Sequence, residues 1–202
     1  MSSSKPSEIF SLEALRNGDR AEFAAMVEAY YAMIYRLSIK MVGNPQDAED
    51  ILQETFIKAY RYLKDFDGRS SLSTWLYRVA TNEALMFLRR KRPEQISIDE
   101  PVETGEGEVE PVQIVDWCCL PEQELLSSEA RLHLDRAIEE LSTSLRIVFV
   151  LRDIQGLSTL ETAEVLNLSE TAVKTRLSRA RLRLREVLSG YYNERLVEGK
   201  QV

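Results

Sequence analysis

The sequence predicts an all-α protein in which an acidic flexible linker joins two helical domains. Apolar residues recur at three- and four-residue steps in both halves of the chain, which is the period of an amphipathic helix. Glycine and proline are scarce, with 8 and 6 among 202 residues, which favours helices over a β-sandwich. Charge is also distributed unevenly along the chain, and this separates the two helical parts.

The acidic stretch between Glu94 and Leu126 sets the expected domain boundaries. It holds ten acidic residues and no basic one, which leaves +3 for the rest of a chain whose net charge is −7. Such a composition does not readily bury a core and is typical of a linker. We expect domains over residues 1–93 and 121–202, with the linker over 94–120. The linker is either a solvated tether or an acidic strand that occupies a basic channel on a partner.

Capping signals bound the first two expected helices. Residues 17–19 are a good start for the first helix, and Gly43 a good stop. Pro45 lies in the first turn of the second, where Asp47 meets the positive end of the helix dipole. The expected apolar faces consist of Phe23, Val27, Tyr30, Ile34, Leu37 and Met41 in the first helix, and Ile51, Leu52, Thr55, Phe56, Ala59 and Leu63 in the second.

A third helix follows the turn at Asp67-Gly68 and begins near Ser71. Its expected core stripe contains Leu72, Leu76, Val79, Ala80 and Glu83 or Ala84. A neighbouring face carries Trp75, Arg78, Asn82 and Met86, and the helix ends in a basic run before Pro93. Aromatic rings stack on unpaired bases, amides read base edges, and arginines hold phosphates. The alternatives are a core tryptophan and a basic end that only complements the helix dipole.

The C-terminal part has the pattern of a helix-turn-helix. Two helices ending at Gly156 are followed by a capping box at Ser158 and Glu161, then by a short turn with Ser169 as N-cap. The last helix should bury Val173, Leu177, Ala180, Leu184 and Val187 or Leu188. Its first turns would enter the major groove, unless this is only a solvated basic surface helix. The candidates for bases and nearby phosphates are Thr171, Lys174, Thr175, Arg176 and Ser178, and those for phosphate or solvent are Arg179, Arg181, Arg183 and Arg185.

Several other classes of protein lack support in the sequence. The adjacent Cys118 and Cys119 do not suit a disulfide framework, and no apolar run has the length of a signal peptide or a membrane span, so we expect a cytoplasmic protein without membrane insertion. No phosphate loop, nucleophile elbow or HExxH spacing occurs, and His133 lies within an amphipathic pattern. We therefore expect no enzyme activity, catalytic residue, metal, cofactor or small-molecule substrate.

Three stretches together resemble the bacterial RNA polymerase sigma factors of the extracytoplasmic-function type (group 4). They are "DAEDILQETFIKAYRYLKDF", "STWLYRVATNEALMFLRRKRP" and "GLSTLETAEVLNLSETAVKTRLSRAR". The resemblance implies a sigma region 2-like bundle and a region 4-like helix-turn-helix. It also implies a transcription factor for stress responses that binds bacterial core RNA polymerase and promoter DNA and is held by an anti-sigma factor. The linker would then thread the polymerase near its active centre.

The resemblance also implies roles for individual residues. For core polymerase they are Asp47, Asp50, Gln53, Glu54, Phe56 and Lys58. For opening the −10 element they are Phe66, Asp67, Gly68, Arg69, Ser70, Trp75, Arg78, Asn82, Arg89, Arg90 and Arg92. For the −35 element they are Ser169, Thr171, Lys174, Thr175, Arg176, Ser178, Arg179 and Arg181.

The sequence departs from the family pattern at Thr171-Ala172, at Ser142 and at the cysteine pair. The first departure bears on the −35 preference. The other classes of function are a one-component transcription factor, which needs a ligand pocket or dimer face within residues 1–92, and an interaction protein such as an anti-sigma factor. The basic, aromatic-bearing third helix counts against the former, and the basic last helix counts against the latter. The two cysteines are either an oxidant sensor or free thiols without a function.

Overall fold

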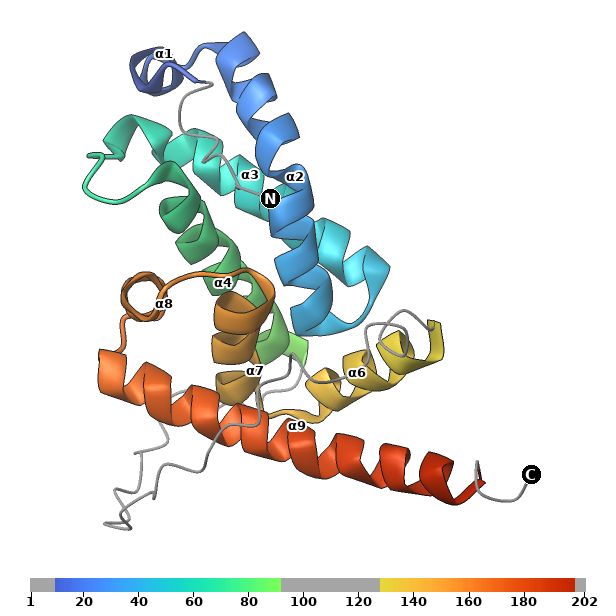
Figure 1. Ribbon diagram of the computed structural model, residues 1–202. Helices are drawn as coiled ribbons and strands as arrows, with labels where there is room; N and C mark the ends of the chain where they lie inside the picture. Colours follow the sequence, from blue (N-terminus) through green and yellow to red (C-terminus); the bar gives the residue numbers. More distant parts are fainter. Residues whose placement is uncertain (1–9, 92–127, 199–202) are drawn as a thin grey trace.

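The computed structural model describes residues 10–91 and 128–198, and every regular element within these ranges is a helix (Figure 1). The predicted all-α class is therefore confirmed for this part of the chain. The expected linker over 94–120, together with Arg92, Cys118 and Cys119, lies outside the described residues.

The described residues 10–91, called the N-terminal domain here, contain four α-helices. They are α1 (Leu12–Arg16), α2 (Arg20–Val42), α3 (Pro45–Tyr62), which continues into the 3-10 turn η2 (Leu63–Asp65), and α4 (Leu72–Lys91). Asp19 caps α2, and Gly43 ends it at a φ of 72°. Pro45 opens α3 as expected, with Asn44 as the N-cap. The short helix α1 was not predicted, because its five residues are too few to show a helical period.

The C-terminal domain contains α6 (Ser128–Glu140), α7 (Thr143–Phe149), α8 (Thr159–Leu166) and α9 (Glu170–Glu198). The predicted capping box of Ser158 and Glu161 is confirmed, and the Ser169 hydroxyl accepts a hydrogen bond from the backbone N–H of Ala172. One feature was not expected: α7 continues into a π-helical turn, η5 (Val150–Ile154), before Gly156 adopts a φ of 75°.

The helix faces predicted from periodicity form most of the core. In α9, Val173, Ala180 and Leu184 are fully buried, and Leu177 and Leu188 are nearly so. In α2, the buried stripe runs through Met26, Tyr30, Ile34, Leu37 and Met41. Phe23, Val27 and Val79 were expected in the core but are only half-buried. The buried residues make one continuous apolar cluster that extends through both domains.

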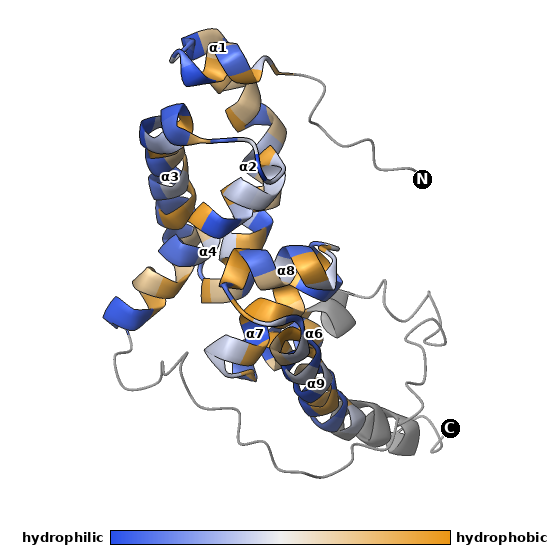
Figure 2. Cartoon of the chain, turned by 90° about the vertical axis from the view of Figure 1, so that its left-hand side faces the viewer, coloured by the Kyte–Doolittle hydropathy of each residue, from blue (hydrophilic) through white to orange (hydrophobic). Residues whose placement is uncertain are grey.

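The two domains pack against each other. Figure 1 shows α8 beside α4 and α6 near the end of α2, and these helix pairs are in contact. In Figure 2, which is coloured by hydropathy, hydrophobic residues lie where α7 and α8 approach α4. This arrangement brings α4 against the helix-turn-helix. No helix among the described residues is long and apolar enough to cross a membrane.

Candidate nucleic-acid and polymerase interfaces

The exposed side of α3 carries the residues expected to contact core polymerase, but they differ in accessibility. Asp50 and Gln53 are exposed and Glu54 is half-buried. Asp47, in the first turn of α3, forms an ion pair with Lys91 at the end of α4. Phe56 is buried, with 8% of its surface exposed, so its ring belongs to the core. Of the six residues, only Asp50 and Gln53 point fully to solvent.

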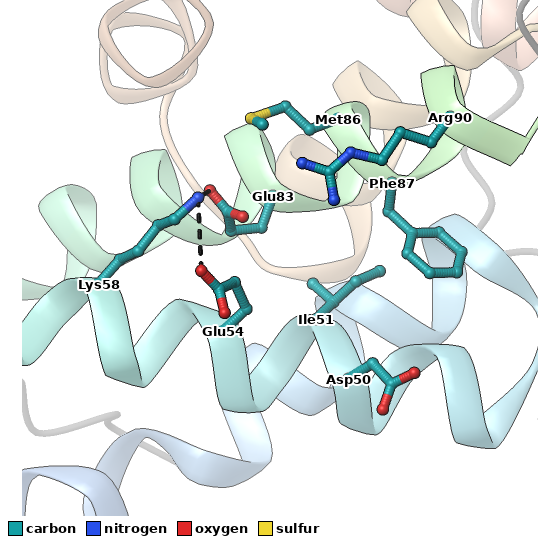
Figure 3. Close-up of a pocket in the computed structure, with 8 residues that line it drawn as sticks. All are labelled: Asp50, Ile51, Glu54, Lys58, Glu83, Met86, Phe87 and Arg90. Carbon is teal, nitrogen blue, oxygen red and sulfur yellow. Dashed lines mark hydrogen bonds and ion pairs between the residues drawn. The ribbon is translucent and has the colours of Figure 1, made fainter.

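Lys58 is held between α3 and α4. Its ammonium lies 2.6 Å from a carboxylate oxygen of Glu83 and 3.7 Å from one of Glu54 (Figure 3). The Glu83 side chain is only 10% exposed, so the ion pair compensates a nearly buried charge. Glu83 was expected as a possible core position, and burial at that position is confirmed. The geometry gives Lys58 a role in joining the two helices.

An apolar groove of about 600 Å³ lies between α2 and α3 beside Gln53. Ile57 and Tyr60, which line it, are 45% and 47% exposed, and the half-buried Phe23 packs edge-on against the Tyr60 ring. The sequence had not indicated Ile57 or Tyr60 as surface residues of a site, whereas Phe23 had been expected in the core. One signal in the sequence could have revealed Ile57 and Tyr60. Both are large apolar side chains on α3 that lie outside the face that helical periodicity assigns to the core.

The loop before α4 is organised by its own side chains. Asp67 accepts a hydrogen bond from the backbone N–H of Arg69 at 3.0 Å and forms an ion pair with the Arg69 side chain. Both interactions lower the pKa of Asp67, and the backbone hydrogen bond has the larger effect. The Asp67 carboxyl group therefore stays ionised. Gly68 has a φ of 78°, a conformation that a side chain disfavours. Ser70 is half-buried at the end of this turn.

Beneath this loop, Phe66 and Trp75 form an aromatic pair. Phe66 is 5% exposed, and its ring centroid lies 5.3 Å from that of Trp75. The sequence left two alternatives for Trp75, a tryptophan buried in the core or an exposed ring that stacks on bases. In the structure Trp75 is half-buried, which lies between the two. The pair places an aromatic edge next to the polar loop, where an unstacked base could be received.

Farther along α4, Arg78 and Asn82 are exposed but lie at the contact with the C-terminal domain. Arg78 Nη2 donates a hydrogen bond to the Glu164 carbonyl oxygen of α8 at 2.9 Å. Asn82 lines a small cavity of about 40 Å³ together with residues of α7, α8 and α9, including Arg176. Arg89 and Arg90 are exposed in the last turn of α4. The structure thus brings a residue expected at the −10 element next to one expected at the −35 element.

The first turns of α9 form a largely exposed polar face. Thr171, Lys174, Ser178 and Arg179 are exposed, as is Ser169 at the N-cap. The Thr175 hydroxyl donates to the Thr171 carbonyl oxygen at 3.0 Å, and Arg176 is half-buried at the domain contact. In the turn before α9, Asn167 adopts a left-handed φ of 53°. The exposed polar side chains in its first turns suit a helix that inserts its N-terminal end into a major groove.

Arg181 differs from the other basic residues of α9. Its Nε and Nη2 atoms each lie 2.8 Å from a carboxylate oxygen of Asp153, in the π-helical turn. This bidentate hydrogen bonding raises the pKa of Arg181 above its ordinary value. Arg181 therefore fixes α9 to the end of α7, a role that residue spacing alone did not indicate.

Comparison with known proteins agrees with this geometry. Residues 26–94 match Sigma-70 region 2, and residues 131–184 match Sigma-70, region 4. The chain is 40% identical over 177 residues to the ECF RNA polymerase sigma factor SigW of Bacillus subtilis, covering 88% of this chain and 94% of that protein. It is 35% identical over 173 residues to the RNA polymerase sigma-H factor of Pseudomonas aeruginosa, covering 84% and 88% respectively.

Two solved structures are also similar. CnrH in complex with the cytosolic domain of CnrY superposes with a TM-score of 0.65 at 25% identity, covering 92% of this chain and 99% of that one. The sigma factor RpoE of Bartonella quintana, in complex with the anti-sigma factor NepR, gives a TM-score of 0.59 at 25% identity, covering 83% and 96%.

The fold and the two matched regions define an RNA polymerase sigma factor of the Sigma-70 class. Within that class, the identity to SigW over nearly the whole of both chains places the protein in the ECF RNA polymerase sigma factor family. The chain accordingly directs promoter-specific initiation of transcription. Its family is one of transcription initiation factors rather than of enzymes.

Proposed function

We propose that the two domains divide promoter recognition between them. The loop 66–70 and the Trp75–Asn82 side of α4 receive the opened −10 element, and the first turns of α9 read the −35 element as a duplex. The observation that supports this division most strongly is the polar face of α9. It presents Thr171, Lys174 and Ser178 to solvent at the start of a helix that follows a capped helix and a short turn.

The −10 assignment is supported by the residue types that meet near the loop. An aromatic edge at Trp75, an amide at Asn82 and a guanidinium at Arg78 supply stacking, base-edge and phosphate interactions. Opening a duplex costs base stacking, and such groups offset that cost. We assign Arg89, Arg90 and Arg92 to phosphates that continue along the same strand.

Docking on core polymerase is assigned to the exposed side of α3. Asp50 and Gln53 supply accessible polar groups there, and the groove at Ile57 and Tyr60 supplies apolar surface beside them.

The domains extend over residues 1–93 and 121–202, and the acidic residues 94–120 thread the polymerase near its active centre as a mimic of nucleic acid. CnrH and the Bartonella RpoE are each bound by a partner, CnrY and the anti-sigma factor NepR, and we propose an anti-sigma partner for this chain as well.

The test is reconstitution. The purified chain is mixed with bacterial core RNA polymerase, co-elution is measured, and run-off transcription is then carried out on a randomised promoter pool. Co-elution with selection of a paired −35 and −10 sequence is the expected result. Tight binding to duplex DNA without any binding to core polymerase from its own organism would instead favour a free-standing transcription factor.

A further inference from the structure

The π-helical turn η5 is anchored in the core of the C-terminal domain. Its first two residues, Val150 and Leu151, are fully buried. The backbone N–H of Gln155 donates to the Val150 carbonyl oxygen at 2.9 Å. The backbone N–H of Leu157, just before the N-cap Ser158 of α8, donates to the Leu151 carbonyl oxygen at 3.0 Å. Short π-helical turns are frequent at functional sites, and this one fixes the chain where the helix-turn-helix begins.

The exposed side of η5 contacts α9 through the ion pair of Asp153 and Arg181. Oδ2 of Asp153 lies 2.8 Å from Nε of Arg181, and Oδ1 lies 2.8 Å from Nη2. The side chains of Asp153 and Arg181 are 23% and 31% exposed, so water only partly screens the pair. The pair of Arg183 and Glu186 differs, because it lies within α9, has a contact at 3.1 Å and is more than half exposed. A two-point contact between separate elements constrains how α9 is rotated about its axis.

This ion pair lies directly after the part of α9 that we assign to the −35 element. Lys174, Ser178 and Arg181 are four and three residues apart, so they share one side of the helix. Arg181 is about 10 Å along the helix axis from Lys174. Before α9, the Leu168 backbone N–H donates to the Ala163 carbonyl oxygen at 3.0 Å, which ties the turn to α8. The side of α9 that we assign to DNA is therefore held at both ends, by the turn and by the ion pair.

We propose that Asp153 and Arg181 are positioning residues for −35 recognition. Their two-point contact sets the orientation in which α9 enters the major groove, and neither residue reads a base. This inference rests on the proposed function of α9. Hydrogen bonds to base edges require well-defined distances and angles, whereas long basic side chains reach phosphates from a range of helix orientations. Loosening the ion pair therefore lowers discrimination between −35 sequences more than it lowers affinity for DNA in general.

The charges around the ion pair agree with a positioning role. The Asp153 carboxylate offsets the charge of the Arg181 guanidinium, so the pair adds little net attraction for phosphates. Lys174 and Arg179 are exposed and carry charges that can attract phosphates. Orientation and electrostatic attraction are thus assigned to different residues of the same helix, and this allows them to be tested separately.

Conservative substitutions test the inference in the reconstituted holoenzyme. Arg181→Lys keeps the positive charge on α9 but loses the planar guanidinium that reaches both carboxylate oxygens. Asp153→Asn keeps the size of the side chain and loses its charge. Arg183→Lys makes the first change at the ion pair within α9 and is the matched control. Each holoenzyme is titrated with promoters that share one −10 element. They carry the selected −35 sequence, a single base-pair change within it, or an unrelated sequence in its place.

The measured quantity is the ratio of affinities for the selected −35 sequence and its single-change variants. We expect Arg181→Lys and Asp153→Asn each to lower this ratio by about three- to tenfold, part of the discrimination that a base contact supplies. Affinity for the promoter with the unrelated sequence should not fall. The double variant should discriminate no worse than either single variant, because both changes break the same contact. Arg183→Lys should keep the wild-type ratio.

The outcomes separate this inference from the proposed function. A wild-type ratio in both variants, with only the free energy of unfolding lowered, would overturn it and leave the ion pair a purely structural role. An equal loss of affinity for all promoters in Arg181→Lys would overturn it in favour of a phosphate contact. A wild-type holoenzyme that does not discriminate between −35 sequences would instead contradict the proposed function of α9 itself. Urea denaturation measures the free energy of unfolding and confirms that each variant is folded during the titration.

Discussion

The two helices that we assign to DNA contacts in this sigma factor, α9 and α4, contrast in how accessible they are. On α9, Lys174, Ser178 and Arg179 are exposed to solvent at the start of the recognition helix. On α4, Arg78 is tied to the neighbouring domain and the cavity beside Asn82 is walled by that domain. Both faces were predicted from the sequence by the same argument, namely the types of residue that lie along one side of a helix. The difference teaches that residue type identifies a surface, whereas domain packing decides when that surface is available.

The largest expected effect sharpens the role of α4. Trp75→Ala should reduce run-off transcription by about tenfold or more, because base–aromatic stacking contributes about 1–3 kcal/mol per base and Trp75 also supports Phe66. Permanganate reactivity of the −10 thymines on a cognate promoter measures the melting itself. Affinity for duplex −35 DNA should stay at the wild-type level in the same variant. Unchanged permanganate reactivity would contradict a role for Trp75 in opening.

The next effect distinguishes structural from partner-binding residues on α3. Lys58→Met leaves the nearly buried Glu83 carboxylate without its cation and should lower the free energy of unfolding by about 2 kcal/mol. Lys64→Met, in the exposed η2 turn, is the matched control and should stay within about 0.5 kcal/mol of wild type. Urea denaturation measures both. Equal stabilities would mean that Lys58 does not join α3 to α4.

A third prediction contrasts two basic residues of α9. Lys174→Ala should weaken duplex −35 binding at all salt concentrations and reduce the slope of log affinity against log salt by about 1, since one phosphate contact is lost. Arg181→Ala should leave this slope unchanged and instead lower stability by about 1 kcal/mol, because its partner is Asp153. A reduced slope in Arg181→Ala, with stability intact, would return Arg181 to the DNA contacts.

The smallest effect concerns the domain contact itself. Tyr77→Phe removes the hydroxyl that reaches Gln155 and should lower the free energy of unfolding by about 0.5–1.5 kcal/mol. Urea denaturation measures the change, and transcription by the reconstituted holoenzyme should not fall. A variant as stable as wild type would indicate that this hydrogen bond does not contribute to the contact between the domains.

Much of the fold could be predicted because it depends on local signals. Helix starts at Asp19, Ser158 and Ser169 and the stop at Gly43 follow from capping chemistry, and the buried stripe of α9 follows from its period. The short α1 and the π-helical turn η5 carry no such signal. Their conformations depend on packing, as the pairing of Asp153 in η5 with Arg181 in α9 illustrates.

The candidate sites could be predicted by residue type but not by environment. The sequence placed Lys58 among the partner-binding residues, and nothing local distinguishes it from Asp50. Only the fold shows that Lys58 faces Glu83 of another helix. Phe56 was placed both on the apolar face by its period and among the partner-binding residues by resemblance, and the structure agrees with the period, because Phe56 is buried. In the same way, the sequence separated Asn82 from Arg176 by function, and only tertiary packing brings them to one cavity. Contacts between residues far apart in sequence have no signature in a single chain.

The most direct test of the packing between the two domains is a zero-length cross-link at the ion pair between Lys40 of α2 and Asp135 of α6. A carbodiimide activates the carboxylate and forms an amide only between groups in contact, and mass spectrometry of the digested chain identifies the joined peptides. The account predicts this cross-link in the free full-length chain. Its absence there would contradict the packing of α6 against the end of α2.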